Sequence, residues 1–154
     1  MQNDIQIRTA SAKDSDALLD LYAFLSPGDD RCTTARAAEN IRRISQIEGS
    51  AVLLGLQQDK ILTTCTLIVI PNLTRGGRPY AVIENMVTHP EARGKGLGTS
   101  LLDAACDRAW DNDCYKVMLS TGSTRPSTLS FYEGAGFEQS RTGFEKRRLP
   151  KRVE

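Results

Sequence analysis

The sequence has few of the residues on which metal, redox and membrane functions depend. It contains 4 cysteines and 1 histidine among 154 residues, and no two cysteines form a Cys-x-x-Cys pair. Zinc sites need Cys and His ligands grouped at short spacing. We therefore expect no metal site, and we expect reduced thiols, two or three of them buried. No apolar run approaches the roughly 18 residues that a membrane span requires, so no membrane segment is expected.

The charge balance gives no indication of nucleic-acid binding. The formal net charge is only +1, which gives no basic footprint for nucleic acid. Residues 1–8 lack the charged-then-apolar order of a secretion signal, so a cytoplasmic location is expected. A length of 154 residues with 40% hydrophobic content predicts a single globular domain over residues 1–154.

Hydrophobic periodicity predicts a mixed α/β chain. Alternating or β-branched apolar residues predict strands near residues 5–7 and at 51–56, 60–70, 81–87, 116–119, 137–140 and 144–149. Apolar residues at helical spacing predict helices at 14–25, 33–49, 99–110 and 126–133. The expected fold therefore has about six to seven strands and about four helices.

Three glycines at alternate positions join the strand at 81–87 to the helix that follows. Gly94, Gly96 and Gly98 occupy this joint. Glycines let backbone amides turn toward an anion, and the dipole of the following helix adds to the attraction. The joint is therefore predicted to hold a phosphate group.

Two common phosphate loops do not match this segment. A P-loop needs Lys directly after its second Gly, and Leu97 follows Gly96 here. A dinucleotide-binding fingerprint counted from Gly94 needs a third Gly where the chain has Thr99. The remaining pattern is Arg93-Gly-Lys-Gly-Leu-Gly98 between a strand and a helix.

This pattern resembles the pyrophosphate loop of the GNAT family of N-acetyltransferases, which use acetyl-CoA. The lead-in from Val87 to Arg93 matches the family's Val-x-x-Pro-x-x-Arg, and residues 131–137 are similar to its Phe-Tyr-x-x-x-Gly-Phe segment. The resemblance implies the acyl-CoA N-acyltransferase fold, with a mostly antiparallel central sheet flanked by helices. It also implies transfer of the acetyl group to a primary amine by direct attack in a ternary complex.

The same resemblance implies which residues hold acetyl-CoA. The backbone of the strand end would pair with the pantetheine arm, and the loop amides would surround the pyrophosphate. The residues concerned are Asn85, Met86, Val87, Arg93, Gly94, Lys95, Gly96, Leu97, Gly98, Thr99 and Arg125. Arg125 stands where many family members have Asn, and a guanidinium there could contact pantetheine or a phosphate. Core packing is the alternative role for Met86 and Val87.

Tyr132 is the predicted general acid. It occupies the position from which a family tyrosine protonates the departing thiolate, and a phenol is a suitable proton donor. Packing between Phe131 and Phe137 is the alternative role.

Glu84 is the predicted general base. It lies within the apolar strand 81–87, where partial burial would favour its taking a proton from an ammonium group. A structural Glu, with an amine that needs no base, is the alternative. The lone His89 is expected to be a surface turn residue before Pro90.

The acceptor is less defined. The resemblance implies a pocket built from residues 25–34, 71–80 and 122–125, where Arg75, Arg78 and Arg125 would suit an acidic or phosphorylated small-molecule amine. Residues 83–87 and 114–116 are similar to those of glucosamine-6-phosphate N-acetyltransferases, although Asn85 replaces the usual acidic residue. A protein or peptide N-acetyltransferase and a non-catalytic acetyl-CoA-binding module stay open as alternatives, as does a homodimer.

Overall fold

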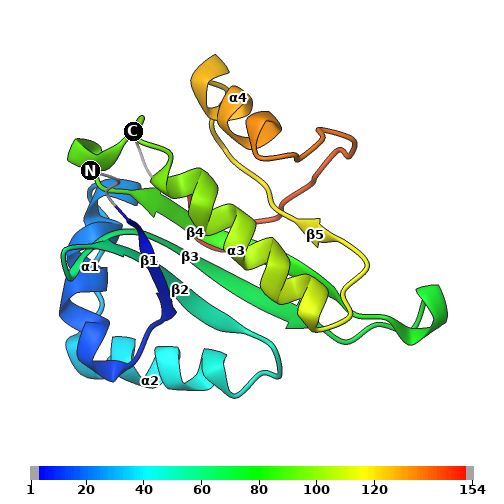
Figure 1. Ribbon diagram of the computed structural model, residues 1–154, viewed down its shortest axis with the longest axis horizontal. Coiled ribbons are helices and arrows are strands. Elements are labelled where there is room, and N and C mark those ends of the chain that lie inside the picture. The colour runs from blue at the N-terminus through cyan, green and yellow to red at the C-terminus, as the bar shows by residue number, and fades with distance from the viewer. Residues whose placement is uncertain (1–3, 152–154) are drawn as a thin grey trace.

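One sheet organises residues 4–151, the part of the chain that the computed structural model describes (Figure 1). Residues 1–3 and 152–154 of the expected domain lie outside the described residues. The strand order is β1-β2-β3-β4-β5, with β5 parallel to β4 and all other neighbours antiparallel. The strands are β1 Gln6–Thr9, β2 Ala51–Gln57, β3 Lys60–Ile70, β4 Tyr80–Thr88 and β5 Val117–Met118.

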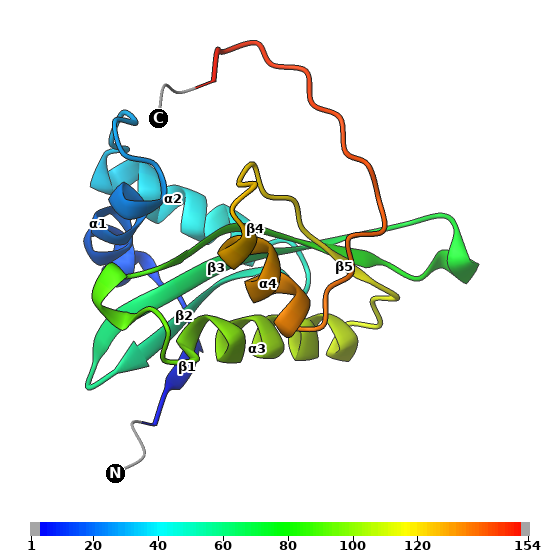
Figure 2. The same ribbon diagram turned by 90° about the horizontal axis from the view of Figure 1, so that it is seen from above.

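Helices cover both faces of this sheet (Figures 1 and 2). The helices are α1 Ser15–Leu25, α2 Thr34–Ser45, α3 Leu97–Asp111 and α4 Pro126–Gly134. α1 and α2 lie on one face, here called the α1 face, and α3 lies on the other, the α3 face. The predicted mixed, mostly antiparallel α/β fold with four helices is confirmed.

Strand alternation divides the core between the two faces. In β2, Leu53 packs on the α3 face, whereas Leu54 packs on the α1 face. Further along the α3 face, Leu67 and Ile83 meet the buried side of α3, which includes Leu101. Because β2 is buried on both sides, its sequence is a continuous apolar run.

The predicted strand count is wrong. Residues 137–140 and 144–149 form no strand, so the described chain has five strands and not six to seven. Four consecutive charged residues, 145–148, leave this segment no apolar face to bury, and an isolated hairpin without one is not stable. The predicted strand at 116–119 is reduced to the two residues of β5.

All four cysteines are unpaired, as expected. Cys65 and Cys114 are buried, and burial raises the pKa of Cys65 to about 12 and that of Cys106 to about 11. These two groups are therefore protonated thiols at neutral pH. Within residues 4–151 no three potential metal ligands cluster, and no helix is long and apolar enough to cross a membrane.

Candidate active site

A β-bulge interrupts β4 at its centre. Thr66 pairs with Glu84 and Thr64 pairs with Val87, so β4 uses one more residue than β3 between these pairs. Asn85, with φ of +53°, lies in this interval. Asn is among the few non-glycine residues that tolerate this conformation, which was the signal in the sequence for the bulge. The bulge turns Met86 toward the α3 face, where it packs on the core.

β5 leaves β4 just before the bulge. The two strands pair only at Ala81 with Val117 and at Val82 with Met118. From Ile83 onward the outer edge of β4 has no strand partner within the described chain. An extended ligand can add to such an edge as a further strand, through backbone hydrogen bonds. The predicted pantetheine contacts, residues 85–87, lie along this free edge.

The glycine loop ends in an uncapped helix. Gly94 and Gly96 have φ of +73° and +81°, which favours glycine at both positions. α3 begins at Leu97, two residues before the predicted start, and no side chain caps it. The first amides of α3 have no partner inside the helix. The loop therefore presents free N–H groups and the positive helix end, which fit a pyrophosphate.

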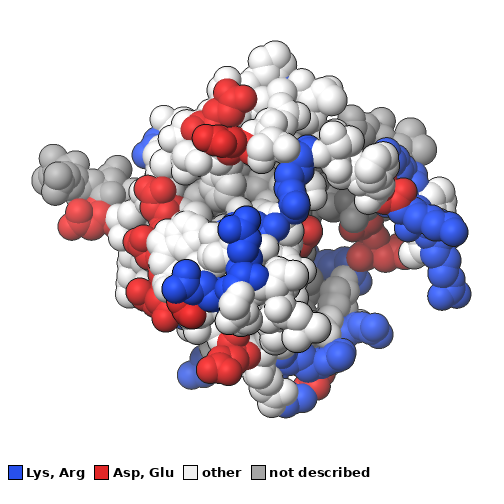
Figure 3. Space-filling view, turned by 90° about the vertical axis from the view of Figure 1, so that its right-hand side faces the viewer, with Lys and Arg blue, Asp and Glu red and all other residues white. Residues whose placement is uncertain are grey.

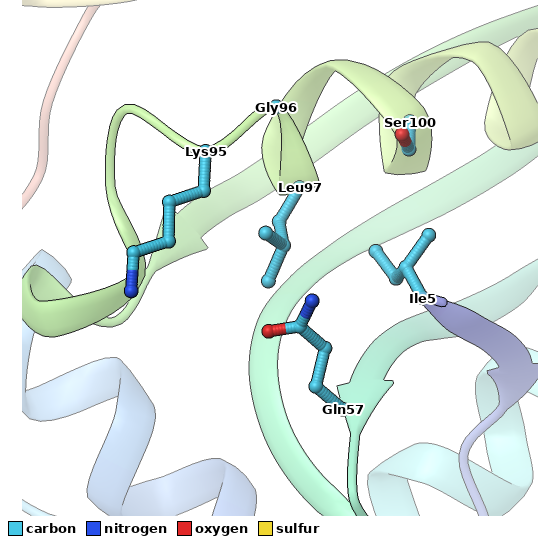
Figure 4. Close-up of a pocket in the computed structure, with 6 residues that line it drawn as sticks. All are labelled: Ile5, Gln57, Lys95, Gly96, Leu97 and Ser100. Carbon is cyan, nitrogen blue, oxygen red and sulfur yellow. The ribbon is translucent and has the colours of Figure 1, made fainter. Parts of the chain in front are cut away.

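Arg93 Nε donates to the Thr88 carbonyl oxygen at 3.2 Å, which fixes the start of the glycine loop to the end of β4. Side chains near the loop also border a hollow. A hollow of about 290 Å³ lies between the start of α3 and the end of β2 (Figure 4). Its lining residues are Ile5, Gln57, Lys95, Gly96, Leu97 and Ser100. This hollow adjoins the loop and includes neither Glu84 nor Tyr132.

Gly98 has a different role from the other two glycines. It is buried in the first turn of α3, and a Cβ there would lie 3.0 Å from Phe131 Cζ and 3.2 Å from Met86 Cε. The missing side chain therefore lets α4 and the bulged strand approach α3 closely. The sequence pattern predicted a role for Gly98 in the loop, and this packing role could not be predicted from it.

Tyr132 is half-buried where α4 meets the α3-face core. Its ring centroid lies 5.0 Å from that of Phe131 and 6.3 Å from that of Phe137. Burial is the main cause that raises the pKa of Tyr132 above the ordinary 10, and Cys65 and the negative charge of Glu84 raise it further. The phenol therefore keeps its proton at neutral pH, as a general acid must.

Glu84 is exposed and lies on the other side of the sheet. Its neighbour Ile83 is buried on the α3 face, so Glu84 points to the α1 face. The expected partial burial of Glu84 is therefore wrong. The bulge at Asn85 and the free edge of β4 from Ile83 onward are here together called the opening in β4. Glu84 and Tyr132 lie on opposite faces of the sheet, an arrangement in which two substrates can meet without sharing one pocket.

Comparisons with known proteins assign the family. The sequence profile of the Acetyltransferase (GNAT) family matches residues 16–137. The chain belongs to the GNAT family. A glucosamine 6-phosphate N-acetyltransferase from Trypanosoma brucei brucei is 31% identical over 136 residues, which cover 87% of this chain and 89% of the relative.

Solved structures agree with this family membership. A protein of Agrobacterium tumefaciens strain C58, described by its name as an acetyltransferase, is 40% identical with a TM-score of 0.87, covering 93% of this chain and 99% of that one. Glucosamine-6-phosphate N-acetyltransferase from Arabidopsis thaliana is 20% identical, with a TM-score of 0.84 and coverage of 95% and 99%, and shows the shared fold. The chain is thus an acetyl-CoA-dependent N-acetyltransferase of the GNAT family.

The arginines predicted for the acceptor do not gather in this GNAT site. Arg75 and Arg78 lie before the start of β4, where Arg75 stacks 5.2 Å over the ring of Tyr115 and Arg78 pairs with Asp113 at 3.7 Å. Glu84 lies four residues into β4, roughly 13 Å along the strand from Tyr80.

Two further residues lie at helix starts. Arg125 precedes α4, about two turns or ~10 Å from Tyr132 along the helix. Arg125 is exposed, and its contact with the cofactor stays a prediction. His89 Nδ1 accepts from the Glu91 amide at 3.2 Å and caps the 3-10 helix Pro90–Ala92, which confirms it as a turn residue.

Proposed function

We propose that this GNAT enzyme acetylates the primary amine of a small phosphorylated molecule, of the amino-sugar phosphate class, in a ternary complex with acetyl-CoA. The observation that carries the proposal is the opening of β4 at Asn85, beside the free amides of α3 and between Tyr132 and Glu84. The acceptor class is supported by relatives named glucosamine 6-phosphate N-acetyltransferases, 31% and 28% identical to this chain.

Acetyl-CoA supplies the activated acyl group, and the chain supplies position and proton transfer. The amides of Gly94, Gly96 and the first turn of α3 bind the pyrophosphate, and the free edge of β4 aligns the pantetheine. In the transfer, the amine nitrogen bonds to the acetyl carbon while the carbon–sulfur bond breaks. The Val87 amide stabilises the charge on the carbonyl oxygen.

An ammonium substrate loses two protons from its nitrogen, and the departing sulfur gains one. Glu84 accepts the first proton before the attack, directly or through water. Tyr132 gives its phenolic proton to the departing thiolate, whose product thiol is the stronger acid of the pair. The nitrogen loses its second proton as the amide forms, and this proton restores the phenol of Tyr132 through solvent. Because the two groups work from opposite faces of the sheet, the amine arrives from the α1 face and the thioester from the α3 face.

Release of free thiol with a panel of amines tests the acceptor class. We expect turnover with glucosamine 6-phosphate and at least a tenfold lower kcat/KM with glucosamine, which lacks the phosphate. A peptide with a free N-terminus or lysine is expected to be a poor substrate. Preference for the peptide, or equal use of glucosamine and its phosphate, contradicts the proposed acceptor.

Titration with CoA tests the loop separately from the acceptor. Gly96→Ala places a Cβ on a residue with φ of +81° and should weaken CoA binding about tenfold, because the loop amides turn away. Gly28→Ala is the matched control, since Gly28 has φ of +83° between α1 and α2 and lies outside the glycine loop. Equal effects of the two substitutions on CoA affinity would contradict the assigned loop.

Three broader properties complete the proposal. The unpaired thiols support a reducing, cytoplasmic location. The GNAT profile spans residues 16–137, which supports one catalytic domain over 1–154. A homodimer is proposed as the assembly.

A further inference from the structure

Buried hydroxyl groups lie at the centre of β3, opposite the opening in β4. Thr63 and Thr64 are fully buried at 0% exposure, and Thr66 is buried at 6%. Because Cys65 packs on the α3 face, Thr64 and Thr66 point to the α1 face. A buried hydroxyl costs free energy unless it is hydrogen-bonded, and Val would fill the same space without that cost. These hydroxyls are therefore expected to do more than pack.

The hydroxyls on the α1 face form a chain of hydrogen bonds with one direction. Thr64 Oγ1 donates to the Leu53 carbonyl oxygen at 2.8 Å, which uses its only proton. Tyr22, from α1, forms hydrogen bonds through its phenol with both Thr64 and Thr66. Thr64 can therefore only accept from Tyr22, and the phenol oxygen is left to accept from Thr66. The chain starts at Thr66, passes through Tyr22 and ends at the Leu53 carbonyl oxygen.

The phenol of Tyr22 keeps this chain uncharged. Burial is the main cause that raises the pKa of Tyr22 above the ordinary 10, and it outweighs the hydrogen bonds with Thr66 and Thr64. The phenol therefore holds its proton at neutral pH, and the direction of the chain is fixed. Since Thr66 gives its own proton to Tyr22, Thr66 Oγ1 offers only lone pairs to any further partner.

Thr66 and Glu84 lie directly opposite each other in the sheet. They form a cross-strand pair of β3 and β4 at the edge of the bulge. The Cβ atoms of such a pair are about 4.5–5.5 Å apart on the same face. A group that meets both side chains meets two acceptors, a carboxylate and a hydroxyl oxygen, so it must be a hydrogen-bond donor. An ammonium group fits, because it has three N–H donors and a charge that Glu84 attracts.

The carboxylate of Glu84 is available to a cation from the substrate. Glu84 is exposed, and none of the ion pairs within residues 4–151 includes it. In Figure 3, Lys and Arg side chains gather on the right-hand side of one face of the molecule. The acids that pair with arginines in the described part of the chain are Asp14, Asp20, Glu39, Asp113 and Glu145.

α1 is fixed over Thr66 and Glu84 at two points. At the first, the Tyr22 phenol hydrogen-bonds with β3. Two residues later, the ring centroid of Phe24 lies 4.8 Å from that of His89, which follows β4 directly. The last turn of α1 therefore borders the opening in β4 on the α1 face, in agreement with its contacts with both strands. An amine that reaches Glu84 there also lies beside Thr66.

We propose that Thr66 Oγ1 is a second anchor for the ammonium group of the acceptor, beside Glu84, and that Tyr22 is the positioning residue that keeps this oxygen an acceptor. The inference rests on the proposed function, which brings the amine to the α1 face. One N–H of the ammonium bonds to Thr66 and another to Glu84. After Glu84 has taken a proton, the N–H bond to Thr66 remains and holds the neutral amine at the opening until it attacks.

Thr66→Val tests the anchor, because Val keeps the shape of the side chain and removes the oxygen. Thiol release is measured with the amine that the wild type uses best, expected to be glucosamine 6-phosphate. The KM for this amine should rise about tenfold, the worth of one hydrogen bond to a charged group, while the KM for acetyl-CoA stays unchanged. Thr66→Ser restores the oxygen and should restore the KM. Ser50→Ala is the matched control, since it removes a buried hydroxyl that accepts from the Val69 amide at 2.8 Å, at the far end of β3.

Tyr22→Phe tests the positioning residue separately. The ring and its packing on the α1-face core are kept, but Thr66 loses the acceptor of its proton and can present that proton to the amine. We expect the KM for the amine to rise about threefold to tenfold, with CoA affinity and the midpoint of thermal unfolding unchanged. Because Tyr22 acts through Thr66, the double variant should be no worse than Thr66→Val alone.

The outcomes separate this inference from the proposed function. Wild-type turnover together with an unchanged KM for the amine in Thr66→Val overturns the inference alone. Equal rises in the KM for the amine and for acetyl-CoA also overturn it, because they show a general change in the site. Additive losses in the double variant overturn the role of Tyr22. Absence of wild-type turnover with every amine overturns the proposed function and the inference together.

Discussion

The two faces of β4 position their proposed catalytic groups in different ways. On the α3 face, Tyr132 is half-buried and its ring packs with Phe131 and Phe137. On the α1 face, Glu84 is exposed and is positioned by its place on the strand. Tyr132 is thus held in place by packing against core residues, whereas Glu84 is not. Substitutions on the α3 face should change chemistry and packing strongly, and those on the α1 face should act more weakly and separately.

Tyr132→Phe is expected to have the largest effect. It removes the phenolic proton but keeps the ring, so kcat should fall about 100-fold or more while the fold and CoA affinity are retained. Steady-state thiol release and CoA titration measure the two effects. Tyr115→Phe is the control, because Tyr115 lies with Arg75 and Lys116 before β5. Full activity of Tyr132→Phe would show that Tyr132 only packs.

The same residue predicts a pH profile. Burial raises the pKa of Tyr132 above 10, so the protonated phenol is the dominant form throughout neutral and mildly alkaline conditions. Wild-type kcat should therefore show no loss from Tyr132 between pH 7 and 9. A drop in that range that disappears in Tyr132→Phe would contradict the raised pKa.

Gly98→Val tests the packing that supports the acid. A Cβ at position 98 would already lie 3.0 Å from Phe131 Cζ and 3.2 Å from Met86 Cε, so both side chains must give by a few tenths of an ångström, and the two methyl groups of Val need further room. Overpacking of this kind costs about 1–3 kcal/mol in the free energy of unfolding. Denaturant unfolding measures this cost, and kcat should also fall because Phe131 adjoins Tyr132. Gly134→Val is the control, since nothing lies within 4 Å of a Cβ there. Equal losses would remove the special role of Gly98.

The sequence predicted the features that repeat along an element and did not predict those that depend on a distant neighbour. The periodic core of β2, β3 and α3 was predicted because burial repeats along each element. The bulge at Asn85 and the close approach at Gly98 were missed because each depends on a neighbour distant in sequence, β3 for the one and Phe131 for the other. Both motifs of the site were found, since their backbone conformations demand particular residues locally.

Residues 144–149 show the converse error, a predicted strand that the structure does not contain. Residues 144–149 have the composition of an edge strand, and the sequence predicted one, yet pairing needs a partner edge that local pattern cannot supply. The exposure of Glu84 was missed for a similar reason. An apolar neighbourhood in sequence does not fix how much of a strand the flanking helices cover, and the α1 face is open at Glu84.

Glu84→Gln should reduce kcat less than Tyr132→Phe. An exposed carboxylate shares its role with water, so the expected loss is about tenfold or less near pH 7, with little change in stability. The loss should shrink at higher pH, where more of the amine is already deprotonated. Glu91→Gln is the control, an exposed Glu outside the opening in β4. A loss as large as that of Tyr132→Phe would mean that the two faces do not differ as proposed.

Asp14→Asn should have the smallest effect, on stability alone, at the start of α1. Arg8 donates to Asp14 at 2.8 Å, and the Ser11 amide donates to the same carboxylate at 2.8 Å. The hydrogen bond from Arg8 is the main cause that lowers the pKa of Asp14 below 3.8. A lowered pKa means that the ionised carboxylate stabilises the fold at neutral pH and that this contribution is lost as the pH falls through the lowered pKa.

Urea unfolding of Asp14→Asn at several pH values measures this contribution. At pH 7 the variant should lose about 1 kcal/mol, the usual worth of a helix-start carboxylate, and the gap to wild type should close as the pH falls through the lowered pKa of Asp14. Asp20→Asn is the control, since its pair with Arg31 is exposed on both sides and should contribute almost nothing. Acetyl transfer at pH 7 should be unchanged in both variants, because Asp14 lies outside the β4 opening. A gap that stays constant with pH would show that the amide geometry of the cap, and not the charge of Asp14, stabilises this end of α1.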